Sequence, residues 1–265
     1  MPDVLHSDLH LPEGLDARKT YEFGLLIADI AGDTLGPALP YLAPALLFSS
    51  PAAQARIGVL QPGDDEVLLH DYQAIRYDAP LPCNRALEIG LTQNGTKTGG
   101  DYAISVSCDG IGALRLDTAL RVVLRRDLLG LKPTQFRAPE SLATLGLRPG
   151  LSVTQAQVDL YLALSGDSNP IHSDAPMAEA LGLAAPIVPG MLLVSTIQPA
   201  CHSALPNAQL ISLKARFMAP LCVGAPYQIA LQDRGKSDAG IRLRAYLMTD
   251  SAQALAVADL VFQAT

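Results

Sequence analysis

Two stretches, AIRYDAPLPCNRALEI (Ala74–Ile89) and KARFMAPLCVGAPYQI (Lys214–Ile229), share one pattern: Arg, an aromatic residue, any residue, Ala-Pro-Leu, then an alternating segment. The first stretch is followed by two segments of alternating apolar and polar residues within 101–125, and the second stretch by two such segments within 239–262. Such alternation is typical of half-buried antiparallel strands joined by turns. The repeated order of these blocks predicts that the fold is built from two similar halves.

The blocks upstream extend the repeat. Gly32-Asp33 and Gly166-Asp167 each precede an Ala-Pro pair and an apolar run. Each half therefore offers one apolar helix and several antiparallel strands, which predicts an α+β fold with a helix packed against a sheet. Residues 131–150 are rich in Pro and Gly without a firm periodicity, so we interpret them as a linker between halves at 1–130 and 151–265.

Composition excludes several classes of partner. The formal net charge is −7 and no basic cluster exceeds two adjacent residues, so we expect neither nucleic acid nor an anionic membrane as a partner. Residues 180–213 carry no charge, but four prolines interrupt them, which favours a buried helix over a membrane span. The four cysteines lack metal-site spacing and the N-terminus lacks an apolar signal segment, so we expect a cytoplasmic protein with reduced thiols.

The polar stretch YLALSGDSNPIHSD, residues 161–174, follows a predicted helix. Thr154 and Gln157 have the spacing of a capping box, and Gly166 is placed to end the helix in the left-handed conformation. Asp167 is therefore expected just beyond the C-terminal end of a helix.

The connection from Asp167 to His172 is expected to be stiff. Asn169 precedes a proline, and a residue in that position is confined to extended backbone geometry. Taken alone, each side chain is more often part of a polar turn or a structural histidine. Together they form a candidate catalytic pair whose side chains converge on one small molecule.

A second helix is predicted to begin at Asp174 and to end at Gly182. The apolar run GMLLVSTIQPA follows, with Gly190 at its start. Backbone N–H groups at the first turn of a helix have no intrahelical partner and lie at the positive end of the helix dipole. The Gly190 N–H is therefore a candidate oxyanion donor for a carbonyl oxygen.

The residues from Tyr161 to Leu193, YLALSGDSNPIHSDAPMAEALGLAAPIVPGMLL, resemble the signature of the MaoC-like (R)-specific enoyl-CoA hydratases and dehydratases. The rest of both halves resembles the double hot-dog members of that family more loosely. The resemblance implies two tandem hot-dog modules, each an apolar central helix wrapped by an antiparallel sheet. It also implies that Asp167 and His172 hold and activate a water molecule, that Asn169 supports them, and that the Gly190 N–H polarises the thioester oxygen.

The resemblance further implies an acyl-CoA substrate, with no metal and no cofactor beyond the coenzyme A of the substrate itself, and a possible homodimer. Many members have a histidine where this chain has Pro189, which changes the rim of the pocket. We expect Pro189 and Met191 to contact the substrate. Lys214 and Arg216, like Lys97, are weaker candidates for contacts with the nucleotide end of coenzyme A.

The N-terminal half keeps an acid, Asp33, but offers no matching histidine or asparagine. We interpret it as a non-catalytic hot-dog half that widens the acyl pocket, as in the double hot-dog relatives. The sequence then favours a hydro-lyase that adds water to a 2-enoyl thioester or removes it from a 3-hydroxyacyl thioester. A hot-dog thioesterase and a non-catalytic acyl-thioester-binding subunit are the alternatives.

Overall fold

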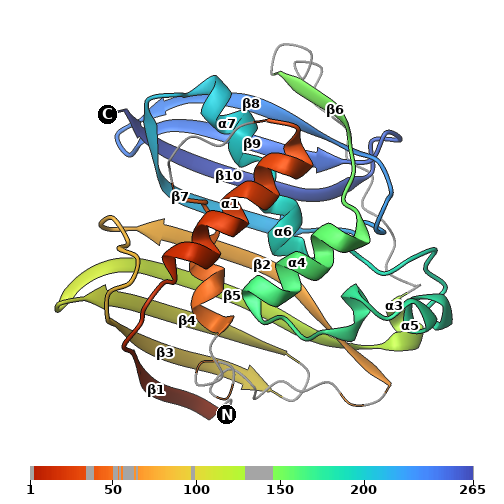
Figure 1. Ribbon diagram of the computed structural model, residues 1–265, viewed down its shortest axis with the longest axis horizontal. Helices are drawn as coiled ribbons and strands as arrows, with labels where there is room; N and C mark the ends of the chain where they lie inside the picture. The colour runs from red at the N-terminus through yellow and green to blue at the C-terminus, as the bar shows by residue number, and fades with distance from the viewer. Residues whose placement is uncertain are drawn as a thin grey trace.

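The computed structural model describes residues 3–33, 39–49, 53, 55, 63, 65–96, 99–128 and 146–264. Within them, ten strands form one sheet in the order β1-β3-β4-β5-β2-β7-β10-β9-β8-β6, in which every pairing is antiparallel (Figure 1). The strands are β1 (Asp3–Leu11), β2 (Glu66–Tyr77), β3 (Leu87–Thr96), β4 (Gly99–Cys108), β5 (Ile111–Leu124), β6 (Leu147–Leu151), β7 (Ala208–Phe217), β8 (Tyr227–Ser237), β9 (Gly240–Met248) and β10 (Ala254–Ala264).

The strand order repeats between the two parts of the chain. The first five strands run β1-β3-β4-β5-β2 from the sheet edge to its middle, and the last five run β6-β8-β9-β10-β7 from the opposite edge. β2 and β7 pair in the middle, with Tyr72 opposite Arg216. The repeated Ala-Pro-Leu stretch connects β2 to β3 in one half and β7 to β8 in the other. The strands predicted from alternation at 101–125 and 239–262 are confirmed as β4–β5 and β9–β10.

The predicted linker needs one correction. Its last residues, 147–150, belong to β6, which pairs with β8 and completes the sheet edge, because these residues adopt extended backbone beside a partner strand. Residues 131–145 of the predicted linker lie outside the described residues. The limits of the two halves, at 130 and 151, otherwise stay a prediction.

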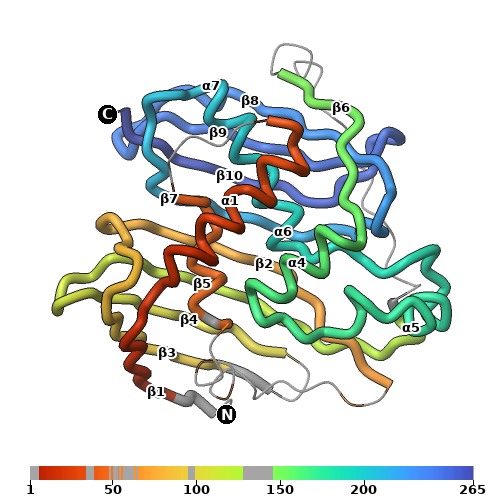
Figure 2. The backbone as a smooth tube through the Cα atoms, in the orientation of Figure 1, coloured from red at the N-terminus to blue at the C-terminus, as the bar shows by residue number. Residues whose placement is uncertain are grey.

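The helices lie on one face of the sheet (Figures 1 and 2). α7 contacts both β8 and α1, while α6 contacts β10, so α6 and α7 lie between the sheet and the outer helices α1 and α4. The helices are α1 (Ala17–Ala31), η1 (Ala43–Ser49), α3 (Arg125–Leu128), α4 (Gln155–Ser165), η3 (Pro170–His172), α5 (Ala175–Ala180), α6 (Gly190–Ser195) and α7 (Gln198–Ala204).

The apolar run that begins at Gly190 is buried as predicted, but it forms two short helices, α6 and α7, and not one. The helix is interrupted at Thr196 and Ile197. Pro199 has no N–H to donate to the carbonyl of Ser195, so the regular bonding pattern cannot continue there. The hydroxyls of Ser195 and Thr196 donate instead to the carbonyls of Met191 and Leu193, each over 2.7 Å.

The apolar helix predicted for the N-terminal half is a 3-10 helix, η1, in the part of the run that the structure describes. Pro40 and Pro44 remove two backbone donors from this segment, which disfavours a regular α-helix. In the described ranges, no helix is long and apolar enough to cross a membrane.

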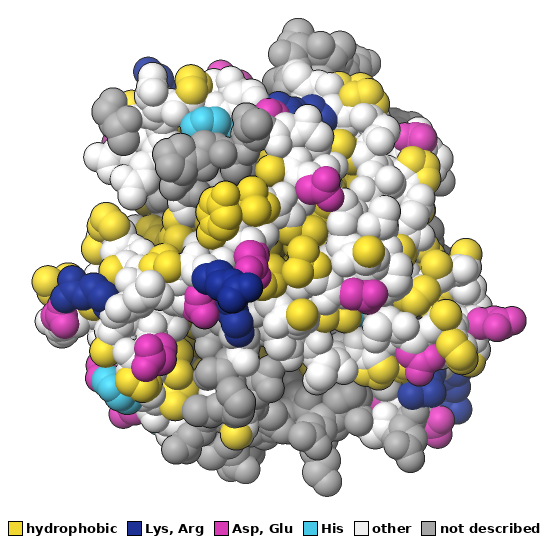
Figure 3. All heavy atoms as spheres, in the orientation of Figure 1, with side chains coloured by type: hydrophobic (Ala, Val, Ile, Leu, Met, Phe, Trp, Pro, Cys, Tyr) yellow, Lys and Arg dark blue, Asp and Glu magenta, His cyan; other side chains and the backbone are white. Residues whose placement is uncertain are grey.

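The surface carries no basic stripe on the face that Figure 3 shows. Its Lys and Arg side chains are scattered, and most lie beside an acidic side chain.

Candidate active site

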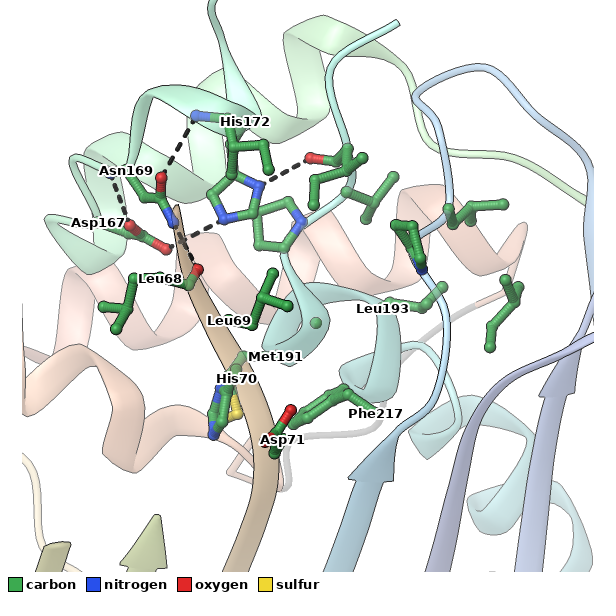
Figure 4. A pocket seen from close by; sticks show the side chains of 18 of the residues that line it. Leu68, Leu69, His70, Asp71, Asp167, Asn169, His172, Met191, Leu193 and Phe217 are labelled. Carbon is green, nitrogen blue, oxygen red and sulfur yellow. Dashed lines mark hydrogen bonds and ion pairs between the residues drawn. The ribbon is translucent and has the colours of Figure 1, made fainter. Parts of the chain in front are cut away.

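A cavity of about 230 Å³ lies where β2 meets β7, beneath the loop from Asp167 to His172. Both halves of the chain line it. The N-terminal half contributes residues 68–71 of β2 and 120–121 of β5, and the C-terminal half contributes Asp167, Asn169, His172 and residues 187–191. Figure 4 shows Asp167, Asn169 and His172 together on one side of the pocket, with His70, Asp71 and Phe217 on another.

Local sequence signals place the loop as predicted. Thr154 and Gln157 form the capping box that begins α4, and Gly166 ends the helix with a left-handed φ of 71°. Asp167 follows directly, and its Oδ1 accepts a hydrogen bond from the backbone N–H of Asn169 over 3.0 Å. One carboxylate oxygen is thereby fixed by the loop, which leaves Oδ2 directed to the pocket (Figure 4).

Asn169 holds the loop from two sides. Its side-chain oxygen accepts from the N–H of Ile171 over 3.4 Å, which caps η3. Its side-chain nitrogen donates to the carbonyl of Leu68 in β2 over 3.2 Å. The supporting role predicted for Asn169 thus includes a bond to a strand of the N-terminal half.

His172 and Asp167 face each other. The distance from His172 Nε2 to Asp167 Oδ2 is 3.7 Å, which is an ion-pair distance and too long for a hydrogen bond. His172 is only 8% exposed, and its Nδ1 lies 2.8 Å from the carbonyl oxygen of Ile187. A carbonyl can only accept, so Nδ1 carries the proton and donates.

Burial lowers the pKa of His172, although Asp167 and the Ile187 carbonyl act in the opposite direction. At neutral pH the ring is therefore uncharged, with a lone pair on Nε2. The Nε2 lone pair and the Asp167 carboxylate are two acceptors that share one side of the pocket. A water molecule or a substrate hydroxyl, placed between them, can donate to both.

Gly190 begins α6 and lines the same cavity, as predicted. Its N–H has no acceptor within the helix because it is the first helical residue. Phe217 covers its Cα: a Cβ added at Gly190 would lie 2.7 Å from both Cδ1 and Cε1 of that ring. Only glycine fits here without moving the aromatic side chain.

The structure brings Pro189 and Met191 to the cavity wall, as the sequence predicted. It does not bring Lys214 and Arg216 there, so their assignment as contacts with the nucleotide end of coenzyme A stays a prediction without support from the cavity. Both residues are exposed in β7, where they alternate with the buried Leu213 and Ala215, so their side chains leave the opposite face of the sheet. Lys97 lies outside the described residues.

The sequence analysis missed the wall that comes from β2 and β5. His70 and Asp71 are consecutive residues of one strand and yet both line the cavity, because β2 has a bulge between His70 and Tyr72. Two polar residues in succession interrupt the alternation of the strand, which is the signal that predicts such a bulge. Arg121 lines the cavity beside Asp71, with which it forms two hydrogen bonds of 2.9 and 3.0 Å.

Asp33, the counterpart of Asp167, has a different environment. It too follows a left-handed glycine at the end of a helix, Gly32 with a φ of 60°. Its Oδ2, however, accepts from Arg148 over 2.7 Å, and the same guanidinium donates to Ser203 over 2.8 Å. The acid of the N-terminal half thus joins an ion pair with the C-terminal half, which fits a structural role.

Residues 140–253 match the family model of the MaoC like domain. This match includes residues 161–193 and so agrees with the resemblance seen there. The chain is 31% identical over 188 residues to 3-hydroxyacyl-thioester dehydratase Y of Mycobacterium tuberculosis. That match covers 65% of this chain and 63% of the relative's own length.

Solved structures share the fold across nearly the whole chain. HtdX of Mycobacterium tuberculosis matches with a TM-score of 0.68 at 19% identity, covering 96% of this chain and 99% of that one. A MaoC-like dehydratase of Phytophthora capsici matches with a TM-score of 0.67 at 14% identity, covering 99% and 96%. The 12:0-ACP thioesterase of Umbellularia californica matches with 0.64 at 11% identity, covering 99% and 94%. The chain thus has a hot-dog-like fold, which occurs in dehydratases and thioesterases alike.

Proposed function

We propose that the protein is a hydro-lyase that adds water to a 2-enoyl thioester, or removes it from a 3-hydroxyacyl thioester, with coenzyme A as the carrier. One observation carries the proposal: Asp167 Oδ2 and His172 Nε2 lie 3.7 Å apart in the cavity that Gly190 also lines. The MaoC-like domain and the 31% identical dehydratase support the same reaction class.

The geometry suggests the following chemistry. The thioester oxygen accepts a hydrogen bond from the Gly190 N–H, which stabilises the enolate-like charge that develops on it. A water molecule donates to Asp167 Oδ2 and to His172 Nε2, which holds its oxygen toward the β carbon. As the oxygen attacks, Asp167 accepts one proton from the water, and the hydroxide that remains forms the bond to the β carbon. Asp167 then passes this proton to the α carbon on the same face, which restores the carboxylate and completes the addition of one water molecule. Dehydration follows the same steps in reverse.

The proposal includes a finer assignment of the two halves. Each half is a hot-dog module, as the repeated strand order supports. The C-terminal module carries the catalytic residues, and the reaction is (R)-specific. The N-terminal module contributes a wall of the acyl pocket through β2 and β5. A homodimer that forms through a sheet edge is part of the same proposal, with β1 and β6 as the edge strands.

A thioesterase is the main rival, because the 12:0-ACP thioesterase of Umbellularia californica shares the fold. Many hot-dog thioesterases place an acid on the central helix, whereas residues 191–204 contain none. The rival reaction also attacks the carbonyl carbon and releases a free thiol. The two reactions therefore give different products from closely related substrates.

The test is to incubate the purified protein with enoyl-CoA and acyl-CoA substrates of varied chain length. Absorbance measures loss of the conjugated double bond, and a thiol reagent measures release of coenzyme A. We expect loss of the double bond without thiol release, and a 3-hydroxyacyl product of (R) configuration. Thiol release from saturated acyl-CoA would establish the thioesterase, and the absence of both reactions would favour a binding subunit.

A further inference from the structure

His70 is a partly buried titratable residue that the proposed chemistry does not use. It lies in β2 of the N-terminal half and lines the same cavity as Asp167 and His172. Its Nε2 lies 3.0 Å from the carbonyl oxygen of Tyr72, across the bulge, so Nε2 carries the proton and donates. Desolvation lowers the pKa of His70 to about 4, and the ring is therefore uncharged at neutral pH.

The imidazole of His70 packs against Phe217 of β7. The two ring centroids are 4.6 Å apart and the planes are inclined by 44°. The Phe217 ring also lies so close to Gly190 that an added Cβ would lie 2.7 Å from two ring carbons. Phe217 thus contacts both His70 of the N-terminal half, beside which Figure 4 shows it, and Gly190, the first residue of α6.

The start of α6 is held by backbone hydrogen bonds and by the packing of Phe217. Pro189 is its N-cap residue and makes no side-chain capping hydrogen bond. The backbone N–H of Val188 donates to the carbonyl of Leu221 over 2.8 Å, which fixes the segment just before the helix. The N–H of Leu193 donates to the carbonyl of Pro189 over 2.9 Å. The ring of Phe217 provides the atoms nearest to a Cβ built at Gly190. A shift of this ring would change the direction of the Gly190 N–H.

We propose that His70 is a positioning residue: held by its bond to Tyr72, its ring fixes Phe217, and Phe217 fixes the Gly190 N–H toward the thioester oxygen. This inference rests on the proposed function, in which Gly190 is the oxyanion donor. It gives the N-terminal half a part in the geometry of the reaction as well as in the shape of the pocket. His70 itself does not touch the reacting atoms.

The kinetic test compares His70→Leu with His70→Gln. Leu has neither a donor nor a planar group, whereas Gln can keep the donor to the Tyr72 carbonyl and lay a planar amide on Phe217. We expect His70→Leu to lower kcat by about 10- to 100-fold with little change in KM, since a small misplacement near the reacting groups has effects of that size. His70→Gln should recover most of the rate, and the exposed His10→Leu serves as a matched control with no loss.

A double-mutant cycle tests whether His70 acts through Phe217. If it does, His70→Leu combined with Phe217→Leu will lower kcat hardly more than Phe217→Leu alone. Independent losses that multiply would overturn the inference. So would a change that appears only in KM and varies with acyl chain length, because that result would make His70 a substrate contact.

A spectroscopic measurement separates this inference from the proposed function. The amide resonance of Gly190 should shift in His70→Leu, return toward the wild-type position in His70→Gln, and stay in place in His10→Leu. If the wild-type protein neither hydrates nor dehydrates thioesters, the proposed function fails, yet this measurement still tests the positioning. An unshifted Gly190 amide in His70→Leu would refute it.

Discussion

Replacing Gly190 with Ala tests the close packing at the start of α6. The added Cβ would lie 2.7 Å from Cδ1 and Cε1 of Phe217, closer than carbon atoms approach in folded proteins. Overpacking of this kind costs about 1–3 kcal/mol. The better helix propensity of Ala offsets up to about 1 kcal/mol of that cost. We therefore expect a net loss of about 1–2 kcal/mol in the free energy of unfolding.

Urea unfolding followed by circular dichroism measures this loss. With a slope of about 3 kcal/mol per molar urea, a loss of about 1.5 kcal/mol lowers the midpoint by about 0.5 M. Gly112→Ala is the matched control, because a Cβ at Gly112 in β5 meets no atom within 4 Å. Its stability should stay within about 0.5 kcal/mol of the wild type.

The double variant Gly190→Ala with Phe217→Leu shows whether the aromatic ring causes the loss. Removing the ring opens space for the new Cβ, so the double variant should be no less stable than Phe217→Leu alone. Our reasoning is refuted if Gly190→Ala is as stable as Gly112→Ala. It is refuted as well if the two losses at Gly190 and Phe217 simply add.

Three further outcomes follow from the structure. The pKa of His70 is about 4 in the folded protein, against its usual 6.5, so the unfolded chain takes up a proton first as the pH falls. The free energy of unfolding therefore decreases between pH 6.5 and pH 4, by at most about 3 kcal/mol. Unfolding curves of His70→Gln across this range should lack that part of the pH dependence; equal slopes would contradict it. Asp33→Asn should lower the free energy of unfolding by about 1 kcal/mol or less, because the ion pair of Asp33 with Arg148 is partly exposed. The kcat should not change. A large loss of kcat would show that the N-terminal half is catalytic. Lys214→Ala and Arg216→Ala should leave KM for an acyl-CoA unchanged, and a several-fold rise in KM would return them to the substrate site.

Local sequence signals predicted the conformation of the loop from Asp167 to His172. The capping box at Thr154, the left-handed Gly166 and the restricted Asn169 each act within a few residues, so their effect can be read directly from the chain. Repetition of the Ala-Pro-Leu stretch similarly predicted equivalent strands, because strand order follows the order of the repeated blocks. The resemblance to the MaoC-like family then gave roles to Asp167 and His172.

The remaining part of the site depends on contacts between residues far apart in the sequence. His70 and Arg121 reach the cavity only because β2 pairs with both β5 and β7 and carries a bulge. Lys214 and Arg216 were assigned from their charge and their place in a strand, which does not indicate the face of β7 that they occupy. Alternation along β7 contained that information: Leu213 and Ala215 are the apolar positions, so their neighbours face outward.

The rate of Asp167→Asn tests the central claim most directly. Asn is nearly the same size, and its side-chain oxygen can still accept from the Asn169 N–H, so the loop should keep its shape. It cannot take a proton from water. We predict that kcat for hydration of an enoyl-CoA falls by about 10²- to 10⁴-fold, while the melting temperature stays near that of the wild type. A variant that keeps the wild-type kcat would contradict the assignment of Asp167 as the base.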